Sequence, residues 1–352
     1  MNKNYDFIII GQGIAGSVLS WYLLERNLKF LVVNDPKKNS SSTAALGVYN
    51  PITGKKFVET WNAKKIIKTV EDFYPKIEKK LGEKFFYKRN IYRPFINNKM
   101  INDWQIRLES KNYNKYIRKL DFKSRHNIIH DHLGGITTKK SGYLNVNKFI
   151  YTTKKHLISN NYYKEISIKL DDIQVKKNHI ELHKIKTKYL IFCIGANQNT
   201  NPFFSWLPFN LVKGETIDIQ MKYELKEIIQ RSILIVPQNK FLYRVGSTYK
   251  WNNISINNTI EGIHELKKKI DKILNFRYKI VSKRCGIRPA SKDRRPFIGF
   301  HPEYKNIGII NGLGSKGISL APYCAKNLVE NILENKMIDN EINIKRYISL
   351  YS

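Results

Sequence analysis

Cysteine, acidic residues and long apolar runs are all scarce in this 352-residue chain. The three cysteines, Cys193, Cys285 and Cys324, show no metal-binding spacing, which argues against a disulfide scaffold and favours a reducing cytoplasm. No apolar run reaches the length of a transmembrane helix. Asp6 and three glycines interrupt the apolar stretch near the N-terminus, and no small-residue cleavage site follows, so an export signal is not expected.

The shortage of acidic residues leaves a large positive charge. Asp and Glu number 29 against 62 Lys and Arg, which gives a formal net charge of +33. Charge of this size can bind nucleic acid or an anionic membrane without specificity. The lysines are spread along the chain among many Asn and Ile residues, however, so a bias of composition explains them as well as a binding face does. We therefore favour composition over a nucleic-acid partner.

The composition predicts a folded protein, and the sequence begins with a motif typical of nucleotide binding. Apolar residues make up 42% and the length suits about two domains. Within residues 5–35, an apolar strand precedes three glycines that open an amphipathic helix, and a second apolar strand follows. In a dinucleotide-binding βαβ unit these glycines allow the tight turn, the approach of a pyrophosphate and the close packing of the helix. The predicted phosphate-binding residues are Gly11, Gly13, Ile14, Ala15 and Gly16.

Two further groups extend this predicted site. The acidic residue expected to bind a ribose, about 20 residues past the glycines, falls on Asn34, and Asp35 lies beside it, so we name both. The loop 40–51 is rich in small residues, which would let its backbone lie against a flat ligand. Its predicted contacts are Ser41, Ser42, Ala44, Ala45 and Gly47.

Sequence features typical of nucleotide binding also occur in the second half of the chain. The apolar run 189–196 ends in a turn at Gly195 and is typical of a buried parallel strand. The tail then contains GLGSKGISLAP, a glycine-rich turn that leads into a helix, and a helix N-terminus carries about half a positive charge. Motifs for one nucleotide therefore lie at both ends and in the middle, which predicts a discontinuous nucleotide domain with a second domain inserted twice.

Taken together, these segments resemble the flavin-dependent family of D-amino acid oxidase and glycine oxidase. The resemblance spans most of the chain and is weakest between about residues 60 and 135. The matching positions in the tail are Gly286, Arg288, Pro289, Asp293, Pro296, Ile298, Gly299, Gly312, Gly314, Gly317, Ile318, Ala321 and Pro322. Further matches are the loop 41–51, Gly142, Tyr143, Ile194, Gly195, Ala196, Lys213, Gly214, Val245, Gly246, Ser247 and Thr248.

This resemblance implies an α/β protein with FAD as its non-covalent cofactor. A discontinuous Rossmann-like FAD-binding domain would comprise 1–60, 136–214 and 281–352. An inserted α+β substrate domain with a mixed or antiparallel sheet would comprise 61–135 and 215–280. The helix start in the tail would face the pyrimidine end of the flavin and stabilise its negative charge on reduction. The residues implied there are Gly312, Gly314, Ser315, Lys316, Gly317 and Ile318.

The resemblance also implies a reaction and a substrate-binding residue. In this family the arginine of the Gly-x-Arg-Pro motif, here Arg288, faces the flavin and holds a substrate carboxylate, which suits the planar guanidinium. A small amine or amino acid would lose a hydride from its Cα to flavin N5, and water would hydrolyse the resulting imine. Oxygen or another acceptor would then take the electrons. Because orientation and electrostatics carry this chemistry, no dedicated base is required.

The sequence also departs from the family. Leu234 stands three residues before Pro237, where these oxidases commonly place a tyrosine. Tyr243 on the following strand is a candidate for the missing hydroxyl, with a packed core aromatic as the alternative. Cys285 is one position away from the covalent flavin attachment of sarcosine oxidases, so a buried thiol is expected. The group His126, His130, Asp131 and His132 fits no zinc-site spacing, and no metal is predicted.

Two alternatives to amine oxidation remain open from the sequence. One is oxidation of a modified tRNA nucleoside side chain, which the positive charge favours, because a tRNA-modifying flavin domain shares this fold. The other is a non-catalytic, flavin-bound interaction protein, which the leucine at position 234 favours.

Overall fold

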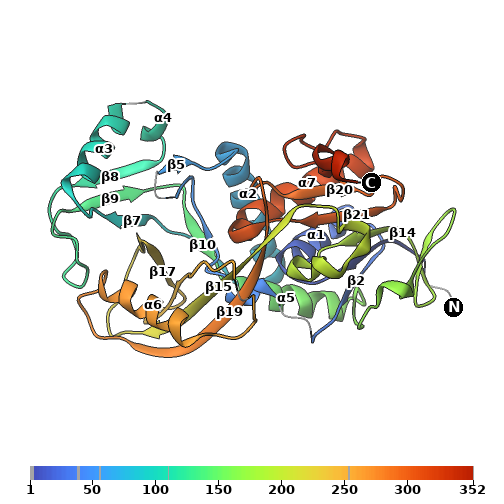
Figure 1. Cartoon of the computed structure of the whole chain (residues 1–352), viewed down its shortest axis with the longest axis horizontal. Coiled ribbons are helices and arrows are strands. Elements are labelled where there is room, and N and C mark those ends of the chain that lie inside the picture. Colours follow the sequence, from blue (N-terminus) through green and yellow to red (C-terminus); the bar gives the residue numbers. More distant parts are fainter. Residues whose placement is uncertain (1–3, 38–39, 55–56, 110, 253, 352) are drawn as a thin grey trace.

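The computed structural model describes residues 4–37, 40–54, 57–109, 111–252 and 254–351. Within these ranges it contains two eight-stranded sheets, which lie in two lobes side by side (Figure 1). Segments from the beginning, middle and end of the chain meet in the lobe that holds β1 and α7, as the colours of Figure 1 show.

The first sheet is a parallel nucleotide-binding sheet. Its parallel strands follow the order β11-β2-β1-β14, and β21 pairs with β14. These strands are β1 (Asn4–Ile10), β2 (Phe30–Asn34), β11 (Tyr163–Glu165), β14 (Ile185–Phe192) and β21 (Ile307–Asn311). Three antiparallel strands extend it: β12 (Ile173–Val175), β13 (Ile180–Leu182) and β20 (Phe297–Phe300).

Both faces of this sheet are covered, which explains its almost continuous apolar strands. In β1, Phe7 and Ile9 pack into one core, while Ile8 and Ile10 pack into the other. Helices pack into the first of these cores: α1 (Ile14–Leu24), α2 (Ala63–Leu81), α5 (Val146–Ser159) and α7 (Gly317–Glu334). Short 3-10 helices at the strand ends are η1 (Ser41–Ala44), η2 (Leu170–Asp172), η3 (Gly195–Thr200), η4 (Pro202–Phe204), η5 (Gly314–Lys316) and η6 (Ile344–Leu350).

The second sheet has the order β19-β15-β18-β17-β16-β7-β9-β8 and is antiparallel except between β16 and β7. Its strands are β7 (Ile91–Pro94), β8 (Ile117–Asp121), β9 (Gly135–Thr138), β15 (Phe209–Gln220), β16 (Ile228–Arg231), β17 (Ile233–Pro237), β18 (Leu242–Gly246) and β19 (Lys279–Ser291). Helix α6 (Ile260–Asp271) packs on one face, and α3 (Asn98–Glu109) and α4 (Lys111–Asn114) lie beyond β8 and β9 (Figure 1). The fold confirms the predicted Rossmann-like domain with an inserted mixed sheet.

Smaller elements join the two lobes. A three-stranded sheet contains β3 (Val48–Tyr49), β10 (Gly142–Leu144) and β6 (Phe86–Lys88), and β4 (Ile52–Thr53) pairs with β5 (Val58–Glu59). Helix α2, which the sequence assigns to the substrate domain, packs on α7, and the Tyr74 hydroxyl donates to the Ile318 carbonyl at 2.9 Å. The domain boundaries given above stay a prediction. In the described part of the chain, no helix is both long and apolar enough to cross a bilayer.

Candidate cofactor and substrate site

The three N-terminal glycines shape the turn between β1 and α1. Gly11 has a positive φ of 100°, and a Cβ there would lie 2.6 Å from the Cys193 carbonyl oxygen. A Cβ on Gly16 would lie 1.9 Å from the carbonyl oxygen of Gly11. Since these neighbours are backbone atoms, larger residues would force the turn and the helix apart. The first and third glycines therefore have the structural roles that the motif predicts.

The loop of residues 40–51, called the serine loop below, lies against the start of α1. Gly13 is the N-cap, and a Cβ on it would lie 3.3 Å from Ser40 Oγ and 3.4 Å from Ser42 Oγ. The backbone N–H of Ile14 donates to Ser42 Oγ at 3.1 Å, and Ser42 N donates to Ser40 Oγ at 3.3 Å. The structure therefore brings together two predicted groups, the glycine turn and the serine loop. Ser40 was not among the predicted contacts.

The start of α7 lies beside the start of α1. A Cβ on Gly317 would be 3.1 Å from Ile14 Cγ2. Among the described residues, the N-cap residue of neither helix makes a side-chain hydrogen bond, and neither first turn contains an acidic residue. In contrast, the side chains of Asn145 and Thr259 cap α5 and α6. Two positive helix ends therefore meet without neutralisation from their own residues, which suits an anionic ligand.

Other turns at this edge of the sheet are held by one buried asparagine. Asn311, at the end of β21, donates through its side chain to the Gly195 carbonyl at 3.0 Å and accepts from Gly312 N at 2.9 Å. Gly195, Gly312 and Gly314 all have positive φ, at 57°, 70° and 54°. Around Gly195 a Cβ would meet no atom within 4 Å, so its turn is open.

The two candidate ribose residues point in different directions. The side-chain oxygen of Asn34 accepts from the backbone N–H of Gln12 at 2.9 Å, which places it at the glycine turn. Asp35 instead accepts from Lys37 N at 3.0 Å and from Ser167 Oγ at 2.9 Å. The structure therefore brings Asn34, rather than Asp35, to the glycine turn.

Lys316 and Ser315 lie in the turn that precedes α7. Ser315 is exposed, and Lys316 is partly buried. Burial, together with the charges of Arg295 and Arg294, lowers the pKa of Lys316. The turn therefore adds a cation beside the positive helix end.

Strand β19 passes between the serine loop and this turn. A Cβ on Gly286 would lie 2.9 Å from Ser41 Cα and 3.3 Å from Ala44 Cβ, and a Cβ on Gly314 would lie 3.6 Å from Ala290 Cβ. Side chains alternate along a strand, so residues 286, 288 and 290 share one face. Arg288 therefore lies on this face, between the two predicted cofactor loops.

The guanidinium of Arg288 is held by neighbours on β15 and in the segment after β18. It lies directly on Gly214 of β15, and its Nη2 donates to Ser247 Oγ at 2.6 Å. Nη1 donates to the Thr248 carbonyl at 3.4 Å, and the Tyr249 ring lies 4.5 Å from the guanidinium carbon. Burial lowers the pKa of Arg288. A planar donor in this environment suits a carboxylate.

The serine loop is also anchored to the second sheet. Thr216 Oγ1 donates to the Ala44 carbonyl at 3.2 Å, and Arg244 Nη1 donates to the Ala45 carbonyl at 3.2 Å. The guanidinium of Arg244 in turn bonds Asp218, with 2.8 Å from Nε to Oδ1. Gly47 continues the loop with a positive φ of 72°, and a Cβ there would lie 2.1 Å from the Leu144 carbonyl oxygen.

The structure corrects the suggestion that Tyr243 replaces the missing hydroxyl. Tyr243 is fully buried in the core beneath α6. Its hydroxyl oxygen lies 2.9 Å from Leu225 N, from which it accepts, and 2.7 Å from the Tyr223 carbonyl, to which it donates. Leu234 does lie on the side of the serine loop, in an apolar cluster with Leu46 and Val48. An aliphatic wall therefore stands where the family places a hydroxyl.

The residues set aside in the sequence have other partners. Cys285 is buried and its Sγ lies 3.7 Å from the Ser255 carbonyl oxygen, on the face of β19 opposite Arg288. Asp131 accepts from the Tyr92 hydroxyl at 2.7 Å, and His126 lies 3.6 Å from Glu227. Among the described residues, no group of three or more His, Cys, Asp or Glu side chains has a metal-binding arrangement.

Sequence reasoning missed the partners of Arg288 and of the glycine turns. Gly214, Ser247 and Thr248 were recognised as family matches, but nothing in the sequence gave them a role beside Arg288. Tyr249 and Asn311 carried no signal, because their contacts depend on strand pairing across long sequence separations.

Comparison with known proteins identifies the family of the chain. The family model DAO, described as FAD dependent oxidoreductase, matches residues 6–331. The D-amino acid dehydrogenase of Helicobacter pylori is 24% identical over 194 residues, which cover 51% of this chain and 46% of that protein. Glycine oxidase of Bacillus subtilis (strain 168) is 30% identical over 137 residues, which cover 37% of this chain and 36% of that protein. The chain thus spans about half or less of the length of these curated relatives.

Solved structures match along nearly the whole chain. Glycine oxidase from Geobacillus kaustophilus has a TM-score of 0.79 at 16% identity, with 98% of each chain covered. Iminodiacetate oxidase (IdaA) from Chelativorans sp. BNC1 has a TM-score of 0.80 at 16% identity, with 97% of this chain and 98% of that chain covered. At this identity the likeness shows a shared fold.

Proposed function

We propose, because this chain belongs to the DAO family of FAD-dependent oxidoreductases, that it oxidises the C–N bond of a small amine or amino acid that carries a carboxylate. FAD is its cofactor. The observation that carries the proposal is the position of Arg288, whose guanidinium lies on the face of β19 between the serine loop and the turn before α7.

The chain supplies binding, orientation and electrostatics for this reaction. When bound, FAD accepts the hydride from the substrate Cα. The starts of α1 and α7, whose own N-cap residues make no side-chain hydrogen bond, would hold the negative groups of the cofactor. The start of α7 with Lys316 would stabilise negative charge that develops during reduction. Arg288 would hold the substrate carboxylate through two N–H groups and so fix the orientation of its Cα.

An apolar cluster on the serine-loop side of the second sheet supports a substrate with an apolar side chain. The described apolar cluster on the serine-loop side of the sheet contains Leu46, Val48, Leu234, Val236 and Tyr143. Burial raises the pKa of Tyr143 to about 12, so its hydroxyl stays protonated at neutral pH. We infer that the uncharged end of the substrate contacts this apolar cluster, while its carboxylate faces the guanidinium.

The test is anaerobic reduction of the flavoprotein by a panel of amines and D-amino acids, followed through the flavin absorbance. We expect at least one carboxylate-bearing amine to bleach the flavin. Arg288→Ala should retain flavin and raise KM, because the carboxylate loses a charged partner. The matched control is Lys283→Ala, which removes one positive charge from an exposed position of the same strand. A panel in which no compound reduces the flavin, or an Arg288→Ala variant with unchanged KM, would overturn the proposal.

Three finer points belong to the same proposal. We place the protein in the cytoplasm, because its three cysteines are free and buried. We infer that FAD is held without a covalent bond, because Cys285 faces Ser255 instead of the cofactor loops. Oxygen or another acceptor would reoxidise the flavin, and the rate of absorbance recovery with oxygen or with a soluble quinone distinguishes the two.

A further inference from the structure

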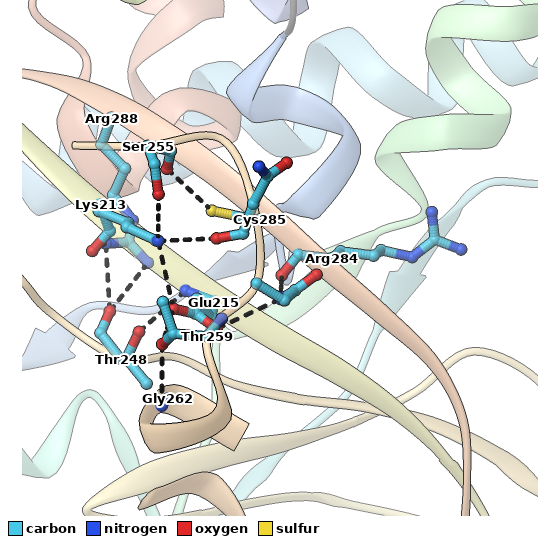
Figure 2. Close-up of polar contacts among 11 residues, drawn as sticks. Lys213, Glu215, Thr248, Ser255, Thr259, Gly262, Arg284, Cys285 and Arg288 are labelled. Carbon is cyan, nitrogen blue, oxygen red and sulfur yellow. Dashed lines mark hydrogen bonds and ion pairs between the residues drawn. The ribbon is translucent and has the colours of Figure 1, made fainter. Parts of the chain in front are cut away.

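A buried ion pair lies on one face of β15, and the Arg288 guanidinium lies on the opposite face. Lys213 and Glu215 flank Gly214, and their side chains are 1% and 0% exposed. Lys213 Nζ lies 3.5 Å from Glu215 Oε1, and Figure 2 shows both side chains directed towards the segment that precedes α6. Two charges so deeply buried require additional hydrogen bonds to offset their loss of hydration.

Those additional bonds all go to the end of one segment, residues 247–259. Lys213 Nζ donates to Ser255 Oγ at 3.0 Å and to the Asn257 carbonyl at 2.7 Å. The carboxylate of Glu215 accepts from Thr259 N at 2.9 Å and from Thr259 Oγ1 at 2.8 Å (Figure 2). The pair therefore fixes the point at which this segment enters α6.

The backbone of the same two residues holds the beginning of the segment. Glu215 N donates to Thr248 Oγ1 at 2.9 Å, and Thr248 N donates to the Glu215 carbonyl at 3.2 Å. Lys213 and Lys250 exchange both backbone hydrogen bonds, at 2.8 and 3.1 Å. Both ends of segment 247–259 are thus attached to Lys213 and Glu215.

The described residues of the segment, which leave out position 253, have little apolar packing of their own. Tyr249, Trp251 and Ile256 are 51%, 57% and 55% exposed. A segment with few buried apolar contacts depends on its hydrogen bonds for a fixed position. The attachment to Lys213 and Glu215 therefore contributes to the position of Ser247, Thr248 and Tyr249, which follow the paired strand β18.

These three residues contact the guanidinium of Arg288, whose Nη1 also donates to the Lys213 carbonyl at 3.5 Å. We propose that Lys213 and Glu215 are positioning residues for Arg288, and that their ion pair sets the geometry with which the guanidinium receives a carboxylate. This inference rests on the proposed function of Arg288. It assigns a role at the substrate site to two residues that lie on the far face of the sheet and touch neither substrate nor cofactor.

The test uses the double variant Lys213→Met/Glu215→Gln in the flavin-bound protein. Removing one partner alone would leave a buried unpaired charge, whereas the double change removes both charges and retains an acceptor for Thr259. We expect KM for the carboxylate-bearing substrate to rise about 10- to 100-fold with kcat nearly unchanged, because a small misplacement of a binding group has effects of this size. The kcat/KM of an amine without a carboxylate should not change.

A second readout reports on the segment without turnover. Hydrogen exchange in peptides that cover 247–252 should be faster in the double variant than in the wild-type protein. The matched control is Lys148→Met/Glu83→Gln, which removes an exposed ion pair with an N–O distance of 2.8 Å from the nucleotide-binding lobe. Neither the exchange of 247–252 nor KM should change in this control.

The outcomes separate the two proposals. An equal loss for amines with and without a carboxylate, or unchanged exchange in 247–252, overturns the positioning role. If no compound of the panel reduces the flavin of the wild-type protein, or if Arg288→Ala leaves KM unchanged, the proposed function fails. In that case faster exchange in 247–252 of the double variant still supports the attachment of the segment, and unchanged exchange rejects it.

Discussion

The guanidinium of Arg288 occupies the space that a side chain on Gly214 would fill. A Cβ on Gly214 would lie 1.8 Å from Arg288 Nη2 and 2.2 Å from Cζ, while the backbone of Gly214 lies outside the left-handed region. The substitution Gly214→Ala therefore disturbs the guanidinium and not the strand. We expect KM for a carboxylate-bearing substrate to rise about 10- to 100-fold, with flavin content unchanged. Steady-state kinetics and the flavin-to-protein absorbance ratio measure both.

A double-mutant cycle shows whether Gly214 acts through Arg288. In an Arg288→Ala background there is no guanidinium to displace, so Gly214→Ala should cause no further loss. Additive losses in the double variant would mean that the glycine has a separate role.

Much of the nucleotide-binding lobe follows from local sequence. The glycines at 11, 13 and 16 lie close together in the sequence, so their spacing can be recognised directly. Their neighbours, such as Ile9 and Cys193, are placed beside them by the βαβ topology that the motif predicts. The run 189–196 is apolar on both faces because both faces are covered, so its identification as a central strand required no tertiary information.

The substrate side could not be predicted in the same way. Tyr243 and Leu234 lie on opposite faces of the second sheet, and the face of each is fixed by register: Tyr243 pairs with Ile219, and Leu234 pairs with Gly246. A shift of one residue in register would exchange the faces. The sequence shows that these residues are in strands but does not give the register. The choice at Tyr243 between a site hydroxyl and a packed core aromatic therefore stayed open, and the structure shows the packed core aromatic.

A second prediction concerns the contact between Gly16 and Gly11. A Cβ on Gly16 would lie 1.9 Å from a backbone oxygen, whereas a Cβ on Gly317 would lie 3.1 Å from a side-chain methyl group that can shift. We expect Gly16→Ala to lower the free energy of unfolding by about 1–3 kcal/mol or more and to reduce flavin binding. Gly317→Ala is the matched control and should have the smaller effect on stability. Urea unfolding of the flavin-free proteins compares them, and equal losses would contradict the backbone contact.

A third prediction concerns the cation in the turn before α7. If Lys316 lies beside the flavin, Lys316→Met should lower the two-electron midpoint potential by about 30 mV, which corresponds to about 1.4 kcal/mol. Burial and the two neighbouring arginines lower the pKa of Lys316, so its ammonium is lost at a lower pH than that of an exposed lysine. The wild-type potential should therefore fall more steeply than that of the variant as pH rises into the alkaline range.

Arg294 provides the control for this measurement. Its side chain is exposed, so Arg294→Ala removes a charge that solvent and salt screen, and the potential should change little. Spectroelectrochemical titration of the three proteins gives the comparison. An equal shift for both variants would show that net charge, and not the position of Lys316, controls the potential.

The last prediction concerns Arg93, a buried cation for which the described residues offer no acidic partner. Arg93 is 1% exposed on β7, and its guanidinium donates from Nη2 to the Ile52 carbonyl, while Nε and Nη1 have no hydrogen-bond partner among the residues that the structure describes. Burial lowers the pKa of Arg93 to about 9, because the buried environment disfavours the charged guanidinium. Arg93→Met keeps much of the apolar volume and removes the charge. It should raise the free energy of unfolding at pH 7 by about 1–4 kcal/mol.

The pH dependence tests the cause of this gain. Above about pH 9 the folded protein begins to lose the proton at Arg93 while the unfolded chain still binds it, so this group makes wild-type stability increase with pH in that range. The destabilisation is fully present below pH 9 and declines above it. The advantage of Arg93→Met should therefore be largest at pH 7 and smaller at pH 10, while Arg93→Lys, which keeps a charge, should gain no stability at pH 7. Urea unfolding of the wild-type protein and the two variants at pH 7 and pH 10 measures these differences. A loss of stability in Arg93→Met at pH 7 would show that the guanidinium stabilises the fold.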